Sequence, residues 1–187
     1  MKRFRFLLVF SLLVFSSCDD IEELFEEEFE VETTFITELE INVPNDASQD
    51  AVQFQSNFGF WNFREDPNVT EFLSDPDEIE RVEIKSVRYF YKDVVGNELA
   101  HVEGELVFVV GQGNEEFDTV VTNLKQADEN NTLFTLDADF TNVNNALTVL
   151  DAIGLYYSGS VSDNPVSFIT DVSITAVVTI KPELDNL

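Results

Sequence analysis

The sequence predicts an all-β fold, an antiparallel β-sandwich of immunoglobulin-like architecture with one or two short helices. Several segments alternate apolar and polar residues with a period of two, which is typical of strands with one buried face. Turn residues separate these segments at the spacing of a two-sheet sandwich. The 187 residues are 44% hydrophobic and include 18 Phe, so a core is expected despite a net charge of −27. A lipocalin-type barrel is the alternative, but the expected interior faces are bulky and uniformly apolar.

Residues 1–17 have the layout of a secretory signal peptide. A basic start, MKRFR, precedes the apolar run Phe6 to Phe15 and two serines. This run is shorter than the roughly 20 residues that span a bilayer. The stretch FSSC, ending in the chain's one cysteine, Cys18, resembles the lipobox of bacterial lipoproteins, although Phe15 stands where Leu is usual. The resemblance implies cleavage before Cys18, acylation of its sulfur and a lipid anchor in the membrane.

Residues 18–30 are crowded with acids, and three interpretations stay open. The segment is a self-repelling tether, or a helical stalk, because its apolar residues fall near helical spacing. It also resembles the acidic export signal of Bacteroidota surface lipoproteins, which is carried here by Asp19, Asp20, Glu22 and Glu23. We favour a tether and an export signal together.

The folded domain is expected over residues 31–182, followed by a short tail, 183–187. Residues 31–43 place apolar side chains on one face and glutamates on the other, which predicts a half-buried strand. A second strand is expected in residues 51–60. If alternation continues through it, the core face holds Val52, Phe54, Phe58 and Phe60.

The middle of the chain mixes helix-start signals with further strands. Asp66-Pro67 and Asp75-Pro76 each predict a short helical turn, with an acidic N-cap before a first-turn proline. Residues 82–94 and 98–110 flank Val95-Gly96-Asn97, which predicts a hairpin. The turn at 111–114 leads into a strand over 117–122.

A polar loop is expected over residues 124–131, then a strand over 132–140. Helical spacing of Val143, Ala146, Leu147 and Leu150 predicts a helix capped by Asn142 and closed by Gly154. The last strands are 155–161 and 166–180. In the final strand seven residues face one way: Val166, Phe168, Val172, Ile174, Ala176, Val178 and Ile180.

No catalytic or metal site is singled out by the titratable residues. His101 is the one histidine and shares a strand face with Glu103 and Glu105. Because no second histidine or further cysteine can join it in a metal site or a triad, we expect a solvent-facing strand residue.

Two acidic clusters are candidates for weak surface calcium binding: Asp137 with Asp139, and Asp75 with Asp77 and Glu78. Neither has the spacing or the glycine of an EF-hand loop, so simple solvation is preferred and no cofactor is expected. A small hydrolase using two carboxylates is a remote alternative, since no acid–base pair stands out.

Aromatic residues provide the candidate binding surface. Trp61 falls on the face opposite Phe58 and Phe60, Tyr89 and Tyr91 oppose Phe90, and Tyr156-Tyr157 places one ring on each face. Outward rings beside acids and amides are suited to stacking on sugars or holding a partner. The candidate ligand-binding aromatics are Trp61, Tyr89, Tyr91 and Tyr156, although burial of these rings as packing material is the preferred interpretation.

Asp118-Thr119-Val120 resembles the three-residue site at which Bacteroidota O-glycosylate exported proteins. The resemblance implies a glycan on Thr119.

These observations predict a non-enzymatic, lipid-anchored lipoprotein of the bacterial envelope, at the outer membrane or the cell surface, with a binding or structural role. Its partners would be the membrane, through the anchor, and a protein or a glycan. An accessory glycan-binding surface lipoprotein, like those of outer-membrane polysaccharide-uptake systems, is the main alternative. Nucleic acid is excluded because a surface this negative repels phosphate backbones.

Overall fold

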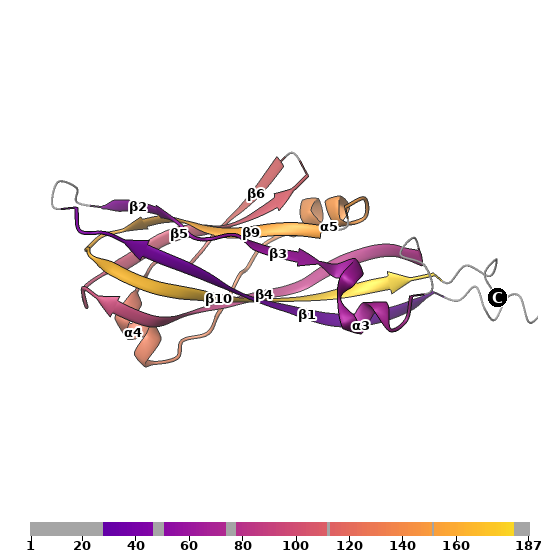
Figure 1. Cartoon of the computed structure of the whole chain (residues 1–187), viewed down its shortest axis with the longest axis horizontal. Helices are drawn as coiled ribbons and strands as arrows, with labels where there is room; N and C mark the ends of the chain where they lie inside the picture. Colours follow the sequence, from indigo (N-terminus) through magenta and orange to yellow (C-terminus); the bar gives the residue numbers. More distant parts are fainter. Residues whose placement is uncertain (1–27, 47–50, 74–77, 112, 151, 182–187) are drawn as a thin grey trace, which may run out of the picture.

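The computed structural model shows an elongated sandwich of two β-sheets (Figure 1). It describes residues 28–46, 51–73, 78–111, 113–150 and 152–181. The leader, most of the acidic segment, the Asp75-Pro76 turn and the tail lie outside these residues. So do Cys18 and the expected export-signal residues Asp19, Asp20, Glu22 and Glu23.

Sheet A contains the longest strands and has the order β1-β10-β4-β8. Its strands are β1 (Phe29–Val43), β10 (Val166–Ile180), β4 (Ile79–Gly96) and the short β8 (Phe134–Thr135). The antiparallel β1–β10 pair runs without interruption from Phe29↔Ile180 to Val43↔Val166. The described chain therefore starts and ends at the same end of the sandwich.

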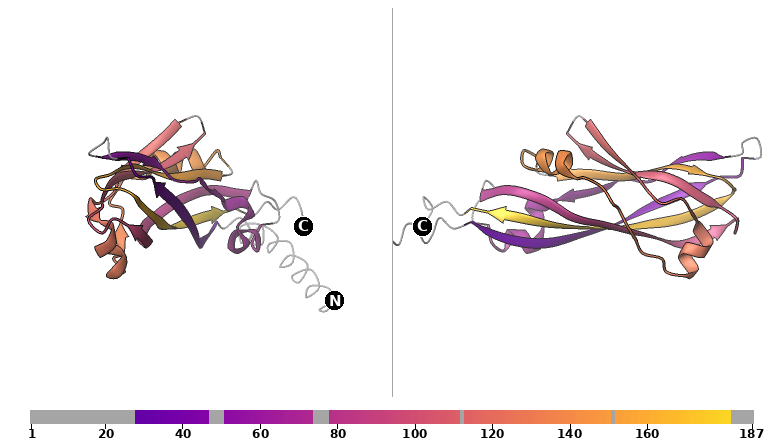
Figure 2. Two further views of the ribbon diagram at one scale, coloured as in Figure 1. Left: turned by 60° about the vertical axis from the view of Figure 1, so that its left-hand side comes forward. Right: turned by 180° about the vertical axis from the view of Figure 1, so that it is seen from behind.

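Sheet B has the order β2-β9-β5-β6, with β3 pairing to β9 and β7 pairing to β5. Its strands are β2 (Val52–Gln55), β3 (Gly59–Asn62), β5 (His101–Val110), β6 (Gly113–Asp118), β7 (Thr122–Asn123) and β9 (Ala152–Val161). The two sheets face each other in both views of Figure 2. Between them lies one cluster of buried apolar side chains, to which both sheets contribute. The predicted antiparallel sandwich is confirmed.

Short helical segments lie along the two sheets (Figure 1). They are η1 (Phe63–Glu65), α3 (Pro67–Thr70), α4 (Leu124–Glu129) and α5 (Thr141–Leu147). The Asp66 cap of α3 is confirmed, since its carboxylate accepts from the Asn68 backbone N–H at 2.9 Å. The helix expected near residue 143 is also present. Its start is stabilised by Asp139, which accepts from the Thr141 N–H at 2.9 Å, and not by the expected Asn142.

Three expectations for local structure are wrong. Residues 124–131, expected as a polar loop, contain α4, because the Asn123 side chain caps the Gln126 N–H at 2.8 Å. The strand expected over 132–140 shrinks to the two residues of β8. Gly154 does not end a helix but lies within β9.

The expected 82–110 hairpin is also wrong, because β4 and β5 belong to different sheets. The turn between them carries the chain across the sandwich instead of pairing its neighbours. Gly96 makes this crossing: its φ of +123° is rarely adopted by other residues, and an added Cβ would lie 2.3 Å from the Pro165 carbonyl oxygen.

Candidate binding surface

Three of the four aromatic side chains expected at the surface lie inside the core. Trp61 is 3% exposed, and Tyr89 and Tyr91 are each 1% exposed. The candidate outward orientation is therefore wrong for these three residues, and none of them offers a ring to a ligand. Tyr156 lies outward and half-buried, whereas its neighbour Tyr157 is fully buried, as the one-ring-per-face expectation requires.

An extra residue between β2 and β3 explains the reversal at Trp61. Gln55 pairs with Ser158 and Gly59 pairs with Leu155, so three residues, 56–58, lie opposite only two residues of β9. One inserted residue exchanges the two faces of everything that follows it. Trp61 therefore enters the core.

The same irregularity occurs in β4. Ser86 pairs with Thr175 and Ile84 with Ala176, which leaves Lys85 as an extra residue on β4. Alternation that begins at Val82 would place Phe90 inside, but the shift turns Tyr89 and Tyr91 inward instead.

Phe58 and Phe60 face outward as a result and are 52% and 64% exposed. Phe60 lies on β3, an edge strand of sheet B, and Phe58 lies directly before it; both point away from the core. Phe58 stacks on Tyr156 of β9, with ring centroids 5.9 Å apart and planes inclined by 29°. We call Phe58, Phe60 and Tyr156 the aromatic face.

The ring of Phe58 packs directly against the backbone of Gly154. A Cβ added at Gly154 would lie 2.1 Å from Phe58 Cε1, so only glycine lets the ring lie there. Across β5, Val107 pairs with Tyr156 and is only 1% exposed, although it points outward. Side chains thus cover this part of sheet B, and Phe58 is held in place before any ligand arrives.

Acids and small hydroxyl side chains border the aromatic face. Glu105 lies opposite Ser158, one outward position along from the Tyr156–Val107 pair, and Ser158 Oγ donates to Glu105 Oε1 at 3.3 Å. Asp118 of β6 lies opposite Glu105, and Glu116 opposite Val107. The strands of sheet B contain five acids and neither Lys nor Arg.

A chain of buried hydroxyl groups links the two sheets beneath this surface. Tyr91 Oη lies 2.9 Å from Tyr157 Oη, which lies 2.9 Å from Thr119 Oγ1. Thr119 Oγ1 donates to the Gly104 carbonyl oxygen at 2.7 Å. Each hydroxyl has one hydrogen, so Tyr157 must donate to Thr119 and Tyr91 to Tyr157.

This network bears on the expected glycosylation of Thr119. Its side chain is 9% exposed, and its hydroxyl hydrogen is engaged by Gly104. A sugar on Oγ1 would replace that hydrogen, so the folded domain does not present Thr119 as an accessible acceptor. Glycosylation of Thr119 stays a prediction from the sequence.

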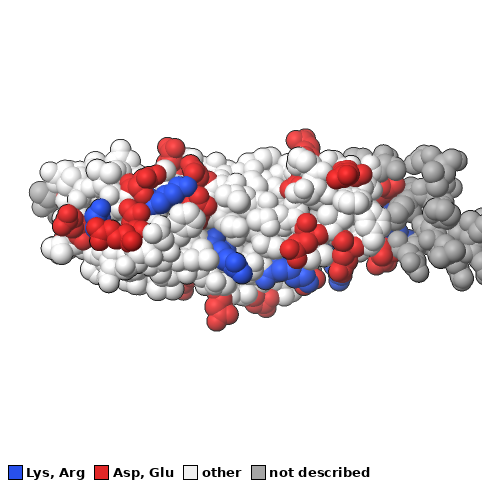
Figure 3. Space-filling view, turned by 90° about the horizontal axis from the view of Figure 1, so that it is seen from below, with Lys and Arg blue, Asp and Glu red and all other residues white. Residues whose placement is uncertain are grey.

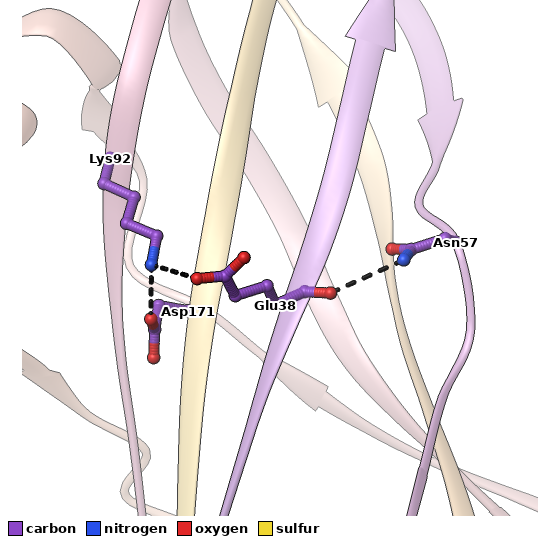
Figure 4. Close-up of polar contacts among 4 residues, drawn as sticks. All are labelled: Glu38, Asn57, Lys92 and Asp171. Carbon is purple, nitrogen blue, oxygen red and sulfur yellow. Dashed lines mark hydrogen bonds and ion pairs between the residues drawn. The ribbon is translucent and has the colours of Figure 1, made fainter.

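The outer face of sheet A carries a charged cluster instead of aromatic rings. Lys92 Nζ contacts Glu38 Oε1 at 2.6 Å and Asp171 Oδ2 at 2.7 Å, so one ammonium joins three strands (Figure 4). The hydrogen bond to Asp171 raises the pKa of Lys92 most, and the hydrogen bond to Glu38 raises it further. Asn57 donates to the Glu38 carbonyl oxygen at 3.5 Å and fastens β1 to the β2–β3 connection.

A groove beside β4 contains the carboxylates Glu83, Asp137 and Asp139 and has a volume of about 380 Å³. Hydrogen bonds from the Thr141 hydroxyl and backbone N–H lower the pKa of Asp139. A hydrogen bond from Lys85 lowers the pKa of Glu83. Both shifts favour the ionised form, which is opposite to what a general acid in glycoside hydrolysis requires.

The remaining titratable candidates from the sequence are His101 and the acidic cluster at residues 75–78. His101 is exposed at the start of β5, and its Nδ1 lies 2.8 Å from the Leu99 carbonyl oxygen. Glu78 is buried, while Asp75 and Asp77 lie outside the described residues. Within the described ranges no group of three or more His, Cys, Asp or Glu could hold a metal ion.

Phe58 and Phe60 are the surface residues that sequence reasoning missed. The signal was Ser56-Asn57, a polar pair inside an otherwise alternating strand, since Asn is depleted in strands and suits an irregular position. Asn57 contacts the edge of β1: the Glu40 backbone N–H donates to Asn57 Oδ1 at 2.7 Å.

Comparisons with known proteins assign no family. No protein-family model and no curated protein matches the chain. Solved structures that match include turnip yellow mosaic virus, with 10% identity and a TM-score of 0.37 over 86% of this chain and 99% of that chain. The decameric BFDV capsid protein matches with 10% identity and a TM-score of 0.38, covering 81% of this chain and 99% of that one. At these TM-scores the matches carry no inference about function.

The part of the chain that the structure describes contains no helix with the length and hydropathy of a membrane span.

Proposed function

We propose that this chain is a lipid-anchored lipoprotein of the bacterial envelope whose sandwich binds a ligand through the outer face of sheet B. The observation that carries the binding role is the outward pair Phe58 and Phe60, with Phe58 held by Tyr156 and Gly154. Both rings are more than half exposed, and contact between apolar surface and water is unfavourable. A ligand that covers them would recover that free energy.

The anchor rests on the leader and on Cys18. β1 begins at Phe29, so the chain between the lipid and the sandwich could extend about 35 Å. The acids continue into β1, where Glu30 and Glu32 are exposed. Such a segment is repelled by anionic headgroups and would hold the sandwich clear of the bilayer. Because the start of β1 and the end of β10 lie at the tethered end, the opposite end, with the β4–β5 and β9–β10 turns, would point away from the membrane.

Membrane fractionation of Cys18→Ser cells tests the anchor. We expect the wild-type chain in the membrane pellet and the variant in the soluble fraction, because acyl chains are the proposed attachment. A variant that pellets with the membrane as fully as the wild type would overturn the anchor.

Protease digestion of intact cells tests the export signal. Replacing Asp19, Asp20, Glu22 and Glu23 with their amides should leave the protein in the membrane but protect it from added protease. Unchanged digestion would leave the acidic segment as a tether alone.

A further inference from the structure

We infer that the aromatic face of sheet B binds a neutral polysaccharide chain lying along β3. This inference names the ligand of the proposed function. It rests on the proposed function for the protein's place at the cell surface, whereas the binding contacts are argued from the structure. The aromatic face consists of Phe58, Phe60 and Tyr156. Its chemistry, shape, area and charge indicate which ligand it binds.

The first argument is the chemistry of the rings. A sugar ring presents carbon-bound hydrogens on its faces and hydroxyl groups around its rim. The face of an aromatic ring carries partial negative charge and attracts such hydrogens. Phe58 is braced by Tyr156 and seated on Gly154, so little ordering entropy is lost when a sugar stacks on it.

The arrangement suits an extended chain. Phe60 lies on β3 and Phe58 comes two residues earlier, directly before that strand, which separates the two residues by at most about 7 Å along the chain. Both rings are more than half exposed, so they form an open strip and not an enclosed pocket. A free monosaccharide needs enclosure to bind well, whereas a polysaccharide can contact both rings in succession.

The area of the aromatic face disfavours a protein partner. The exposed parts of Phe58 and Phe60 amount to roughly 230 Å², taking about 200 Å² for each whole side chain. A stable protein interface buries about 800 Å² on each side, of which about 450 Å² is apolar. The apolar area therefore fits a few sugar units.

Charge decides the class of polysaccharide. Every charged side chain on the strands of sheet B is acidic. Glu105 lies on β5, next to the strand of Tyr156 and two strands from β3, and Glu116 and Asp118 lie one strand further on β6. In sheet A, β4 alone carries four basic residues: Arg81, Lys85, Arg88 and Lys92. Uronate or sulfate groups would be repelled from sheet B, while its carboxylates can accept hydrogen bonds from neutral sugar hydroxyls.

Native gels containing soluble polysaccharides test this inference on the purified full-length chain in neutral detergent. The neutral probes are laminarin, dextran, galactomannan and arabinoxylan, and the acidic probes are alginate and chondroitin sulfate. We expect at least one neutral probe to retard the protein and neither acidic probe to do so. Isothermal titration with the retarding probe should give the same affinity at low salt and at about 1 M NaCl, where charge interactions are screened.

Variants locate the site. Phe58→Ala and Phe60→Ala should each weaken binding about tenfold, equivalent to about 1.4 kcal/mol. Gly154→Ala should also weaken it while keeping every aromatic ring, because the new Cβ displaces Phe58. Phe72→Ala is the matched control: Phe72 is 50% exposed but lies after α3 and packs on Phe29. It should bind like the wild type, and circular dichroism should show all four variants folded.

Three results would overturn the inference. The first is that no neutral probe retards the wild-type chain. The second is that folded Phe58→Ala and Phe60→Ala bind as the wild type does, or that Phe72→Ala loses as much. The third is that poly-lysine displaces the probe and loses its own binding in high salt, which would assign the face to a basic polypeptide. The binding assay uses detergent-solubilised protein and does not depend on the anchor. Its outcome is therefore independent of the Cys18→Ser fractionation, which tests the anchor.

Discussion

Tyr157 joins the two sheets at the centre of the sandwich through its hydroxyl group. It accepts a hydrogen bond from Tyr91 of sheet A and donates one to Thr119, in the loop after β6 of sheet B. Burial raises the pKa of Tyr157 to about 12 and the pKa of Tyr91 beyond the usual range. A buried hydroxyl network of this kind stabilises a fold when every member is paired, and weakens it when one member is lost.

Tyr157→Phe should therefore lower the free energy of unfolding by about 1–3 kcal/mol, because it leaves Tyr91 without an acceptor and Thr119 without a donor. Denaturant unfolding measures the change. Tyr156→Phe is the control and should alter stability by less than about 0.5 kcal/mol, since Tyr156 points outward. Equal losses in both variants would contradict the network.

The tyrosines also set the behaviour of the domain at high pH. Burial raises the pKa of Tyr89, Tyr91 and Tyr157, so the neutral form is favoured in the folded state. Their contribution to stability is complete below the unfolded pKa of about 10 and is lost as the pH rises through the folded pKa of each group, which for Tyr157 is about 12. Tyrosinate absorbance at 295 nm should thus appear for these three together with the loss of β circular dichroism. Their full ionisation near pH 10 in an intact fold would contradict this.

At the scale of elements, β10 is the regular strand and its neighbour β4 absorbs the irregularity. Lys92 of β4 reaches across Asp171 of β10 to Glu38 of β1 and so ties the three strands together on their outer face. Figure 3 views the molecule from below and shows basic side chains lying among more widespread acidic ones. A cation shared by two carboxylates relieves part of the repulsion within this acidic surface.

Lys92→Met should lower the free energy of unfolding by about 1 kcal/mol at neutral pH, with a smaller loss at high salt. The raised pKa of Lys92 means that this stabilisation is complete below about pH 10.4 and disappears as the pH rises through the folded value. Lys85→Met is the control, because Lys85 pairs with Glu83 of its own strand and should cost less. A larger effect at Lys85 than at Lys92 would contradict the cross-strand role.

Strand alternation predicted the elements that contain no inserted residue. In β10 all seven expected inward residues from Val166 to Ile180 are buried, because the inserted residues at these register shifts lie on β4. Alternation failed for Trp61, Tyr89 and Tyr91, because one extra residue upstream exchanges the faces and leaves the hydrophobic pattern almost unchanged. The aromatic face could not be predicted for the same reason.

At the scale of the whole molecule, the two outer faces differ in chemistry. Sheet A presents mixed charge around Lys92, while sheet B presents aromatic rings and acids without a basic residue on its strands. The sandwich is elongated, and both described chain ends lie at one end of it (Figure 1). A tether at that end would leave the whole length of sheet B open to solvent.

The central claim is that an anchored sandwich holds a neutral polysaccharide on Phe58 and Phe60. It is tested most directly by incubating intact cells with the fluorescently labelled neutral polysaccharide that retards the protein in gels. Wild-type and Phe72→Ala cells should retain the label, whereas Phe58→Ala/Phe60→Ala cells and Cys18→Ser cells should not. Equal labelling of wild-type and Phe58→Ala/Phe60→Ala cells, at equal amounts of surface protein, would contradict the account.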